Sequence, residues 1–317
     1  MIKKFNREYI NSQVRSDPKA FVLECESCFN RQMDDVLEAV IEENHRVVCV
    51  AGPSSSGKTT FASMLSKRLE DRGYLPTTMS LDDYFINKSE IPKNENGKYD
   101  FESIDIIDVT LLAKNLLDIA SGKTVRTPIY NFATGKREEF ARLVEGNPNR
   151  IVILEGLHAF DNSILQKVPN LHPLRVYISV ENACRESMDG DTVLLTEYDI
   201  RFLRRMVRDY FFRACPPERT FELWESVLEG EQRNILPVKK YADIYINSVF
   251  LYEPCVMKSF AVPIFKMGES SAAFQAVMDR LVGILEGFEQ IDAGLIPRNS
   301  LLREFIGKEE KGNGYYQ

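Results

Sequence analysis

The chain has 317 residues, of which 44% are hydrophobic and 27% charged, and its formal net charge is −7. This composition is typical of a globular protein with a large core, and the acidic balance argues against a nucleic-acid partner, because phosphate backbones favour clustered lysine and arginine. The first residues contain no apolar segment of the secretory type, and no apolar run is long enough to cross a bilayer. We therefore expect a cytoplasmic protein with no membrane partner.

The first predicted element is a helix. Apolar residues recur at helical spacing over residues 21–43, whereas residues 1–20 carry little pattern. We therefore expect residues 1–44 to form an N-terminal helical extension.

A short apolar strand at residues 47–51 leads directly into the most informative motif of the chain. The motif is Gly52-Pro53-Ser54-Ser55-Ser56-Gly57-Lys58-Thr59-Thr60, it has the form G-x-x-x-x-G-K-[ST], and a helical pattern follows it. Gly52 and Gly57 allow the backbone to turn tightly and to aim successive N–H groups at an anion, at the positive end of a helix dipole. Lys58 supplies a charge for the β- and γ-phosphates, and the Thr59 hydroxyl can enter the shell of Mg²⁺. The motif predicts a site for a nucleoside triphosphate.

The remaining strands predict where the site lies. A strand at residues 75–81, expected next to the first strand, delivers Asp82 and Asp83, and an apolar strand at 151–154 ends at Glu155. Further elements are predicted as a polar loop at 86–100, a helix at 105–120, extended pieces at 125–147, and strands at 174–180 and 242–247. Strands that alternate with helices predict an α/β fold of the P-loop NTPase type, with a parallel sheet covered by helices on both faces. Ligands of such sheets bind beyond the carboxyl ends of the strands, so we expect Lys58, Asp82 and Glu155 to meet there.

These acidic residues suit phosphoryl transfer. Asp82 and Asp83 are candidates for the carboxylate that faces an acceptor hydroxyl, although aspartates at strand ends also serve as helix caps and turn residues. Glu155 follows a fully apolar strand, where an acid in P-loop proteins commonly orients Mg²⁺ or its waters.

An arginine-rich helix is predicted at residues 199–213. Arg201, Arg204, Arg205 and Arg208 fall on one face, and apolar residues fall on the other. Two interpretations stay open: a solvated helix face, or a mobile lid over about residues 199–220 that carries arginines onto the triphosphate.

Several motifs together resemble the uridine kinase and phosphoribulokinase family. They are the loop at residues 52–60, Ser80-Leu81-Asp82-Asp83-Tyr84-Phe85, Tyr99-Asp100-Phe101-Glu102, Pro128-Ile129-Tyr130-Asn131-Phe132, Leu154-Glu155-Gly156, Arg204-Arg205-Met206-Val207-Arg208-Asp209 and Lys240-Tyr241-Ala242-Asp243. Trp224-Glu225-Ser226-Val227, Gly230-Glu231 and Arg303-Glu304-Phe305-Ile306-Gly307 are similar to a bacterial uridine kinase-like branch, whose longer members carry an upstream threonyl-tRNA-synthetase-like module. About 45 residues precede the first strand, so we expect the short form of this branch.

The resemblance implies an organisation and a set of roles. Residues 45–287 would be the kinase domain, with a substrate-binding insertion at about 86–147 and the helical lid, and residues 288–317 would be a C-terminal extension and tail. The catalytic residues would be Asp82 as the base, Lys58, Arg205 and Arg208. The nucleotide, ATP or GTP, would be bound by Gly52, Ser54, Ser55, Ser56, Gly57, Lys58, Thr59, Thr60 and Arg213, and Mg²⁺ by Thr59, Asp82 and Glu155.

A nucleoside is the acceptor that the resemblance implies, most simply uridine or cytidine, phosphorylated at its 5′-hydroxyl. Its site would consist of Asp82, Phe85, Glu102 on the ribose hydroxyls, Tyr130 and Phe132 beside the base, Arg137 and Arg208. Relatives often form homo-oligomers, and the sequence leaves the subunit number open.

Two positions depart from the pattern of the pyrimidine kinases. Gly135 stands where they usually carry a base-contacting histidine, and Cys215 where they tend to have another arginine. Loss of a hydrogen-bonding group weakens selectivity, so two alternatives stay open: a kinase of another small hydroxylated metabolite, as in the phosphoribulokinase part of the family, and a nucleotide-binding regulator with little turnover.

Overall fold

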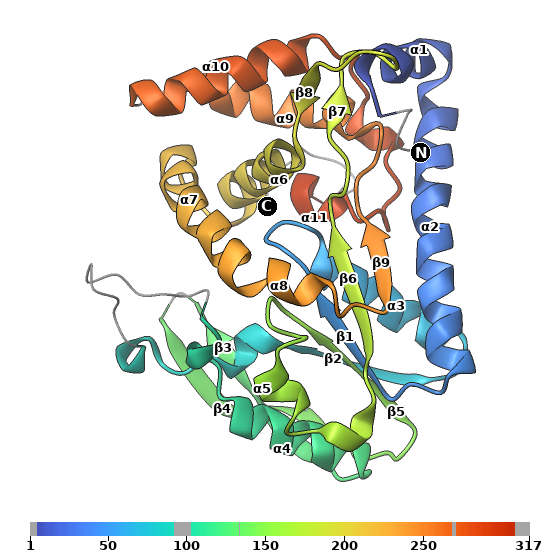
Figure 1. Cartoon of the computed structure of the whole chain (residues 1–317), viewed down its shortest axis with the longest axis vertical. Helices are drawn as coiled ribbons and strands as arrows, with labels where there is room; N and C mark the ends of the chain where they lie inside the picture. Colours follow the sequence, from blue (N-terminus) through green and yellow to red (C-terminus); the bar gives the residue numbers. More distant parts are fainter. Residues whose placement is uncertain (1–4, 92–102, 133, 268–270, 308–317) are drawn as a thin grey trace.

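The computed structural model describes residues 5–91, 103–132, 134–267 and 271–307. Its centre is a parallel sheet with the strand order β2-β5-β1-β6-β9 (Figure 1). In chain order the strands are β1 (Val47–Ala51), β2 (Leu75–Ser80), β5 (Arg150–Glu155), β6 (Leu174–Ser179) and β9 (Ile244–Asn247). The prediction of a parallel α/β sheet of the P-loop type is confirmed. The prediction that β2 lies next to β1 is wrong, because β5 pairs with both of them.

Alternate residues of the central strands enter two separate cores. In β1, Val48 and Val50 point to one face of the sheet, and Val47, Cys49 and Ala51 point to the other. β5 alternates in the same way, since side chains of a strand point to opposite faces in turn. Both faces are therefore covered, which explains why these strands read as continuous apolar runs.

The larger core lies between the sheet and most of the helices. The helices that contribute to it are α1 (Arg7–Ser16), α2 (Pro18–Glu42), α3 (Lys58–Asp71), α6 (Glu197–Phe212), α9 (Glu253–Phe265) and α10 (Ala272–Glu286). α2 runs along one side of the molecule, and α3 lies between it and the sheet (Figure 1). Around this core, β7 (Cys184–Arg185) and β8 (Val193–Leu195) form a small antiparallel hairpin, and α7 (Pro217–Asn234) and α8 (Leu236–Lys239) connect α6 to β9.

The N-terminal residues contain a helix that the sequence pattern did not predict. α1 buries only a few apolar side chains, including Ile10 and Val14, so its periodicity is weak, and its start is marked by Asn6, whose side chain accepts the N–H of Tyr9. α2 begins three residues before the predicted start, because the Asp17 side chain accepts the N–H of Ala20.

The smaller core lies under the insertion. It is covered by α4 (Val109–Ala120), the short α5 (Asn162–Leu165) and the antiparallel hairpin of β3 (Val125–Asn131) and β4 (Lys136–Val144). The predicted extended pieces are therefore one hairpin. The helix predicted from residue 105 begins only at Val109, because a 3₁₀ turn at Ile104–Ile106 comes first and Asp108 caps α4 by accepting the N–H of Leu111.

Among the described residues, no helix combines the length and the apolar character that a membrane span requires.

Candidate active site

The phosphate-binding motif forms a tight loop between β1 and α3. A side chain at Gly52 would place its Cβ 2.0 Å from the carbonyl oxygen of Ile178, and Gly57 has φ +94°, a left-handed conformation that favours glycine. The hydroxyls of Ser55 and Ser56 are buried, and neither has a hydrogen-bond partner in the described part of the chain. Buried hydroxyls of this kind are suited to the oxygens of an anion that enters the loop.

The carboxyl ends of three adjacent strands bring the predicted acidic residues to this loop. In the register of the sheet Glu155 lies opposite Val50 of β1 and opposite Ser80 of β2, and Asp82 follows two residues after Ser80 in a 3₁₀ turn, Leu81–Tyr84. The Thr59 hydroxyl donates to Oε2 of Glu155 at 3.3 Å. Because β5 separates β2 from β1, it is Glu155 that stands between the loop and Asp82.

Electrostatics couples these residues to one another. Burial raises the pKa of Asp82, with a further increase from Asp83, while Lys58 lowers it. Burial also raises the pKa of Glu155, and the charge of Asp82 adds to that effect. Where the charge of one carboxylate raises the pKa of another, a cation placed between them stabilises the charged forms of both.

Lys58 is a cation that interacts electrostatically with both Glu155 and Asp82. Its Nζ donates to the carbonyl oxygen of Pro53 at 2.9 Å, so the side chain folds back over the loop. Burial lowers its pKa, and the attraction of Glu155 and Asp82 opposes that shift. Lys58, Thr59, Asp82 and Glu155 therefore form one interacting group, as the sequence predicted.

Helix α6 holds the phosphate loop through three successive arginines. Arg201 Nη1 donates to the carbonyl oxygen of Ser54 at 3.0 Å, and Arg204 Nη1 donates to that of Ser55 at 3.3 Å. Arg205 Nη1 donates to Oγ of Ser54 at 2.8 Å. The arginine-rich face of α6 is thus turned toward the loop, and the interpretation as a solvated face is wrong.

Two buried carboxylates far along the chain neutralise these arginines. Arg201 makes a bidentate pair with Glu231 of α7, at 2.6 and 2.8 Å, and Arg204 makes one with Glu253 of α9, at 2.6 and 2.7 Å. Glu231 also accepts the backbone N–H of Ser54 at 2.9 Å. The Ser54 peptide is therefore held on both sides, through its carbonyl by Arg201 and through its N–H by Glu231.

Three arginines, two in the second half of α6 and one just past its end, pair with a single acid. Asp209 lies 3.3 Å from Arg205, 2.8 Å from Arg208 and 3.7 Å from Arg213. Arg213 also lowers the pKa of Asp82, after the larger effects of burial, Lys58 and Asp83. Arg205, Arg208 and Arg213, to which the resemblance assigns catalytic and nucleotide-binding roles, are therefore gathered around Asp209. Arg213 also lies within electrostatic reach of the candidate base.

An aromatic group covers the predicted acceptor side. The ring centroids of Phe85, Tyr130 and Phe132 lie 5.1 to 6.2 Å apart in edge-to-face arrangements. Tyr130 and Phe85 are buried in the smaller core, whereas Phe132 is 67% exposed. Asp83 accepts the N–H of Tyr130, so this aspartate fixes the hairpin next to Asp82. Phe132 is thus the member of the group with a free ring surface for a planar ligand.

Of the other predicted acceptor residues, Arg137 lies on the hairpin of the insertion. Arg137 pairs with Asp108 and Glu139 of the insertion, at 3.2 and 2.6 Å. Glu102 lies outside the described residues. Gly135 has φ +67°, and a Cβ there would lie 2.8 Å from Cβ of Lys88, so the position is a tight turn packed against the loop before it.

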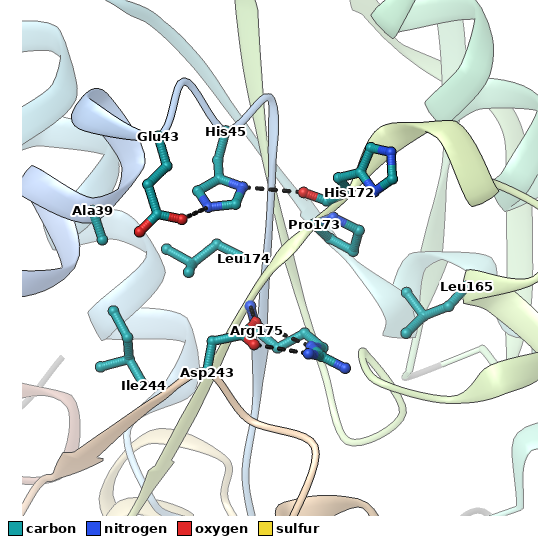
Figure 2. Close-up of a pocket in the computed structure, with 10 residues that line it drawn as sticks. All are labelled: Ala39, Glu43, His45, Leu165, His172, Pro173, Leu174, Arg175, Asp243 and Ile244. Carbon is teal, nitrogen blue, oxygen red and sulfur yellow. Dashed lines mark hydrogen bonds and ion pairs between the residues drawn. The ribbon is translucent and has the colours of Figure 1, made fainter.

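A cavity of about 630 Å³ lies at the opposite end of the strands, where β6 and β9 begin (Figure 2). Its polar side chains contact one another: His45 contacts Glu43 and the carbonyl oxygen of His172, each at 3.0 Å, and Arg175 makes a bidentate pair with Asp243. The unsatisfied serine hydroxyls of the phosphate loop lie at the other end, where we therefore place the nucleotide site.

The fold and this loop define the class: an α/β protein with a P-loop of the nucleotide-binding type. The profile of the phosphoribulokinase / uridine kinase family matches residues 47–252, and the chain belongs to this family.

Individual relatives have related names. A uridine kinase of Macrococcus caseolyticus is 31% identical over 201 residues, which cover 63% of this chain and 86% of the relative. A uridine kinase of Staphylococcus aureus (strain Newman) is 29% identical over the same length, with the same coverage. A solved structure described as "a Possible Uridine Kinase from Bacillus stearothermophilus" is 17% identical, with a TM-score of 0.46, and covers 68% of this chain and 98% of its own. Family membership supports a phosphotransferase of the P-loop kinase type.

Proposed function

We propose that this protein transfers the γ-phosphate of ATP to the 5′-hydroxyl of a nucleoside, uridine or cytidine. The observation that carries the proposal is the meeting of Lys58, Thr59, Asp82 and Glu155 at one edge of the sheet. The loop supplies the phosphate cradle, and the carboxylates stand where an acceptor hydroxyl and a metal ion would be needed.

The donor set fits Mg²⁺. Thr59, Glu155 and Asp82 offer the hard oxygen ligands that this ion prefers, and magnesium sites in kinases use one or two carboxylates together with substrate phosphates. Among the described residues, no group of three or more His, Cys, Asp or Glu side chains is placed to hold a metal ion by itself. When bound, the ion would neutralise charge on the phosphate oxygens.

Asp82 would act as the general base. Its raised pKa strengthens it as a proton acceptor, and Lys58 keeps its charged form accessible. Arg205, Arg208 and Arg213 would stabilise charge on the transferring group, the role that arginines play in phosphoryl transfer.

The names of the relatives and the exposed ring of Phe132 support a nucleoside acceptor. A second candidate is a small phosphorylated sugar. It is favoured by the Gly135 turn, which presents no side chain to a base, and by Arg142, which lies 3.9 Å from Asp83 and is half exposed.

The test measures ADP formation from Mg·ATP with uridine, cytidine, purine nucleosides and sugar phosphates, and identifies the product by mass spectrometry. Acceptor-dependent turnover with uridine or cytidine to a 5′-monophosphate supports the proposal. Turnover with sugar phosphates alone supports the second candidate, and nucleotide binding without any turnover supports a regulator.

A matched pair of variants ties the activity to this site. Lys58→Ala should lower kcat by about 10²–10³-fold, since it removes a charge stabiliser. Lys67→Ala removes an exposed lysine of the same helix that pairs with Asp71, and it should leave kcat unchanged. Equal turnover of the two variants would contradict the assignment.

A further inference from the structure

The last described residues of the chain lie against the phosphate loop. Residues 300–307 contain the short helix α11 (Arg303–Ile306), which packs beside α6 near the centre of the molecule (Figure 1). A Cβ built on Gly57 would lie 2.7 Å from the methyl groups of Leu301, so Leu301 closes the space over this glycine. The C-terminal segment, defined as residues 300–307, is therefore a wall of the phosphate site.

This segment is held rigidly. Arg303 is buried and donates to the carbonyl oxygens of Ala293 and Ile296, at 2.9 and 2.6 Å. The ring of Phe305 lies 5.0 Å from the guanidinium carbon of Arg204. The backbone on both sides of Glu304 is thus fixed relative to α6.

Glu304 reaches two groups of the nucleotide site. Its Oε2 accepts a hydrogen bond from Thr60 Oγ1 at 2.6 Å, and its Oε1 lies 3.9 Å from Nη1 of Arg208. Thr60 belongs to the first turn of α3, where the N–H groups of a P-loop face the α- and β-phosphates. Glu304 also acts on Lys58, where it opposes the pKa decrease caused by burial.

A triphosphate would need the same partners. It carries several negative charges into a region where a carboxylate already holds Thr60 and approaches Arg208. Like charges a few ångströms apart repel one another strongly at a partly buried site. At 19% exposure the Glu304 side chain is partly open to solvent, so it can rotate away from the loop, whereas the backbone that carries it stays in place.

We propose that Glu304 sets the affinity of the nucleotide site: its carboxylate occupies Thr60 and Arg208 when no nucleotide is bound, and the phosphate chain displaces it. The C-terminal segment thereby weakens binding of nucleoside triphosphates by charge. This inference rests on the nucleotide-binding part of the proposed function and makes no assumption about the acceptor.

The deciding variant is Glu304→Gln. Glutamine keeps an oxygen that accepts the hydrogen bond of Thr60 and removes only the charge. Titration calorimetry without any acceptor should show Mg·ATP binding about three- to ten-fold more tightly to this variant than to the unaltered protein. Inorganic tripolyphosphate with Mg²⁺ should gain in the same direction, because the competition concerns phosphate charge alone.

Two further variants complete the test. Glu286→Gln makes the same change of net charge at an exposed residue of α10 that pairs with Lys266, and it should leave both affinities unchanged. Glu304→Ala distinguishes competition from a bracing role, because it removes the hydrogen bond as well as the charge. Competition predicts tighter nucleotide binding for both Glu304 variants, whereas a brace predicts weaker binding for alanine and no change for glutamine.

The outcomes separate this inference from the proposed function. ATP binding by the unaltered protein that Glu304→Gln leaves equal or weakens would overturn the role of Glu304 alone. A gain for ATP without a gain for tripolyphosphate would also overturn it, since the effect would then come from the nucleoside part. Absence of ATP binding in every variant would remove the nucleotide site and the proposed function with it.

Discussion

The pair of Arg201 and Glu231 provides a quantitative test of how the phosphate loop is held. Their side chains are only 4% and 5% exposed, and Arg201 donates three hydrogen bonds, two to Glu231 and one to the Ser54 carbonyl. Replacing one member leaves the other as a buried, unpaired charge, which typically costs about 3–5 kcal/mol. We therefore expect Arg201→Met and Glu231→Leu each to lower the free energy of unfolding by about that amount.

The double variant Arg201→Met/Glu231→Leu should lose less than either single variant, about 1–2 kcal/mol, because no charge stays buried and only hydrogen bonds to Ser54 are lost. Urea unfolding followed by circular dichroism measures all three. Arg15→Met serves as the control, since Arg15 and Glu289 form an exposed pair and its loss should stay within about 0.5 kcal/mol. Single losses below about 1 kcal/mol, or a double loss equal to their sum, would refute the reasoning.

Three other predictions concern single positions. Asp82→Asn should lower kcat by about 10²–10⁴-fold and leave the affinity for ATP similar. In the unaltered protein, protonation of Asp82, whose pKa is raised by burial, should lower kcat on acidification, and the variant should lose this decrease. An equal loss of ATP binding would make Asp82 mainly a metal ligand. Burial also raises the pKa of Glu26, so the folded state binds this proton more tightly than the unfolded chain, and stability rises as the pH falls through the folded-state pKa. Glu26→Gln should therefore increase the free energy of unfolding above the folded-state pKa of Glu26, and the difference should shrink as the pH falls through that pKa. A constant difference across urea titrations at several pH values would contradict this. Gly135→Ala should lower the free energy of unfolding by about 1–2 kcal/mol in the same assay, because φ is +67° and Lys88 is in the way, while an unchanged midpoint would show that the turn adapts.

Much of the site follows from local sequence. The phosphate loop is a contiguous motif, and Asp82 and Glu155 each stand just past an apolar strand, so the rule that carboxyl ends of parallel strands share an edge is enough to bring them together. Strand order does not follow in this way. The interposition of β5 between β2 and β1 depends on how the crossovers pack, and no local pattern of residues 75–80 records it.

The arginines of α6 show a second limit. Helical periodicity correctly placed them on one face, but it does not say what covers that face. The partners that decide their burial, Glu231 and Glu253, come from two other helices. A sequence cue existed for Glu253, which follows the apolar run at residues 249–252, where an unpaired carboxylate would be costly. Glu231 stands among polar residues and has no such cue. The contact of Glu304 with Thr60 spans most of the chain and has no local signal at all.

The burial of these arginines also limits which part of the predicted lid, about residues 199–220, can move. Arg201 and Arg204 are almost fully buried and bound to the loop backbone, so the first turns of α6 cannot open without exposing two ion pairs of the core. Exposure rises toward the carboxyl end of the helix, and the Arg213 side chain is 59% exposed. Just beyond it Ala214 has φ +48°, a left-handed conformation that is strained for a residue other than glycine. We therefore expect closure over a bound triphosphate to involve residues 213–216, between α6 and α7, and not the helix as a whole.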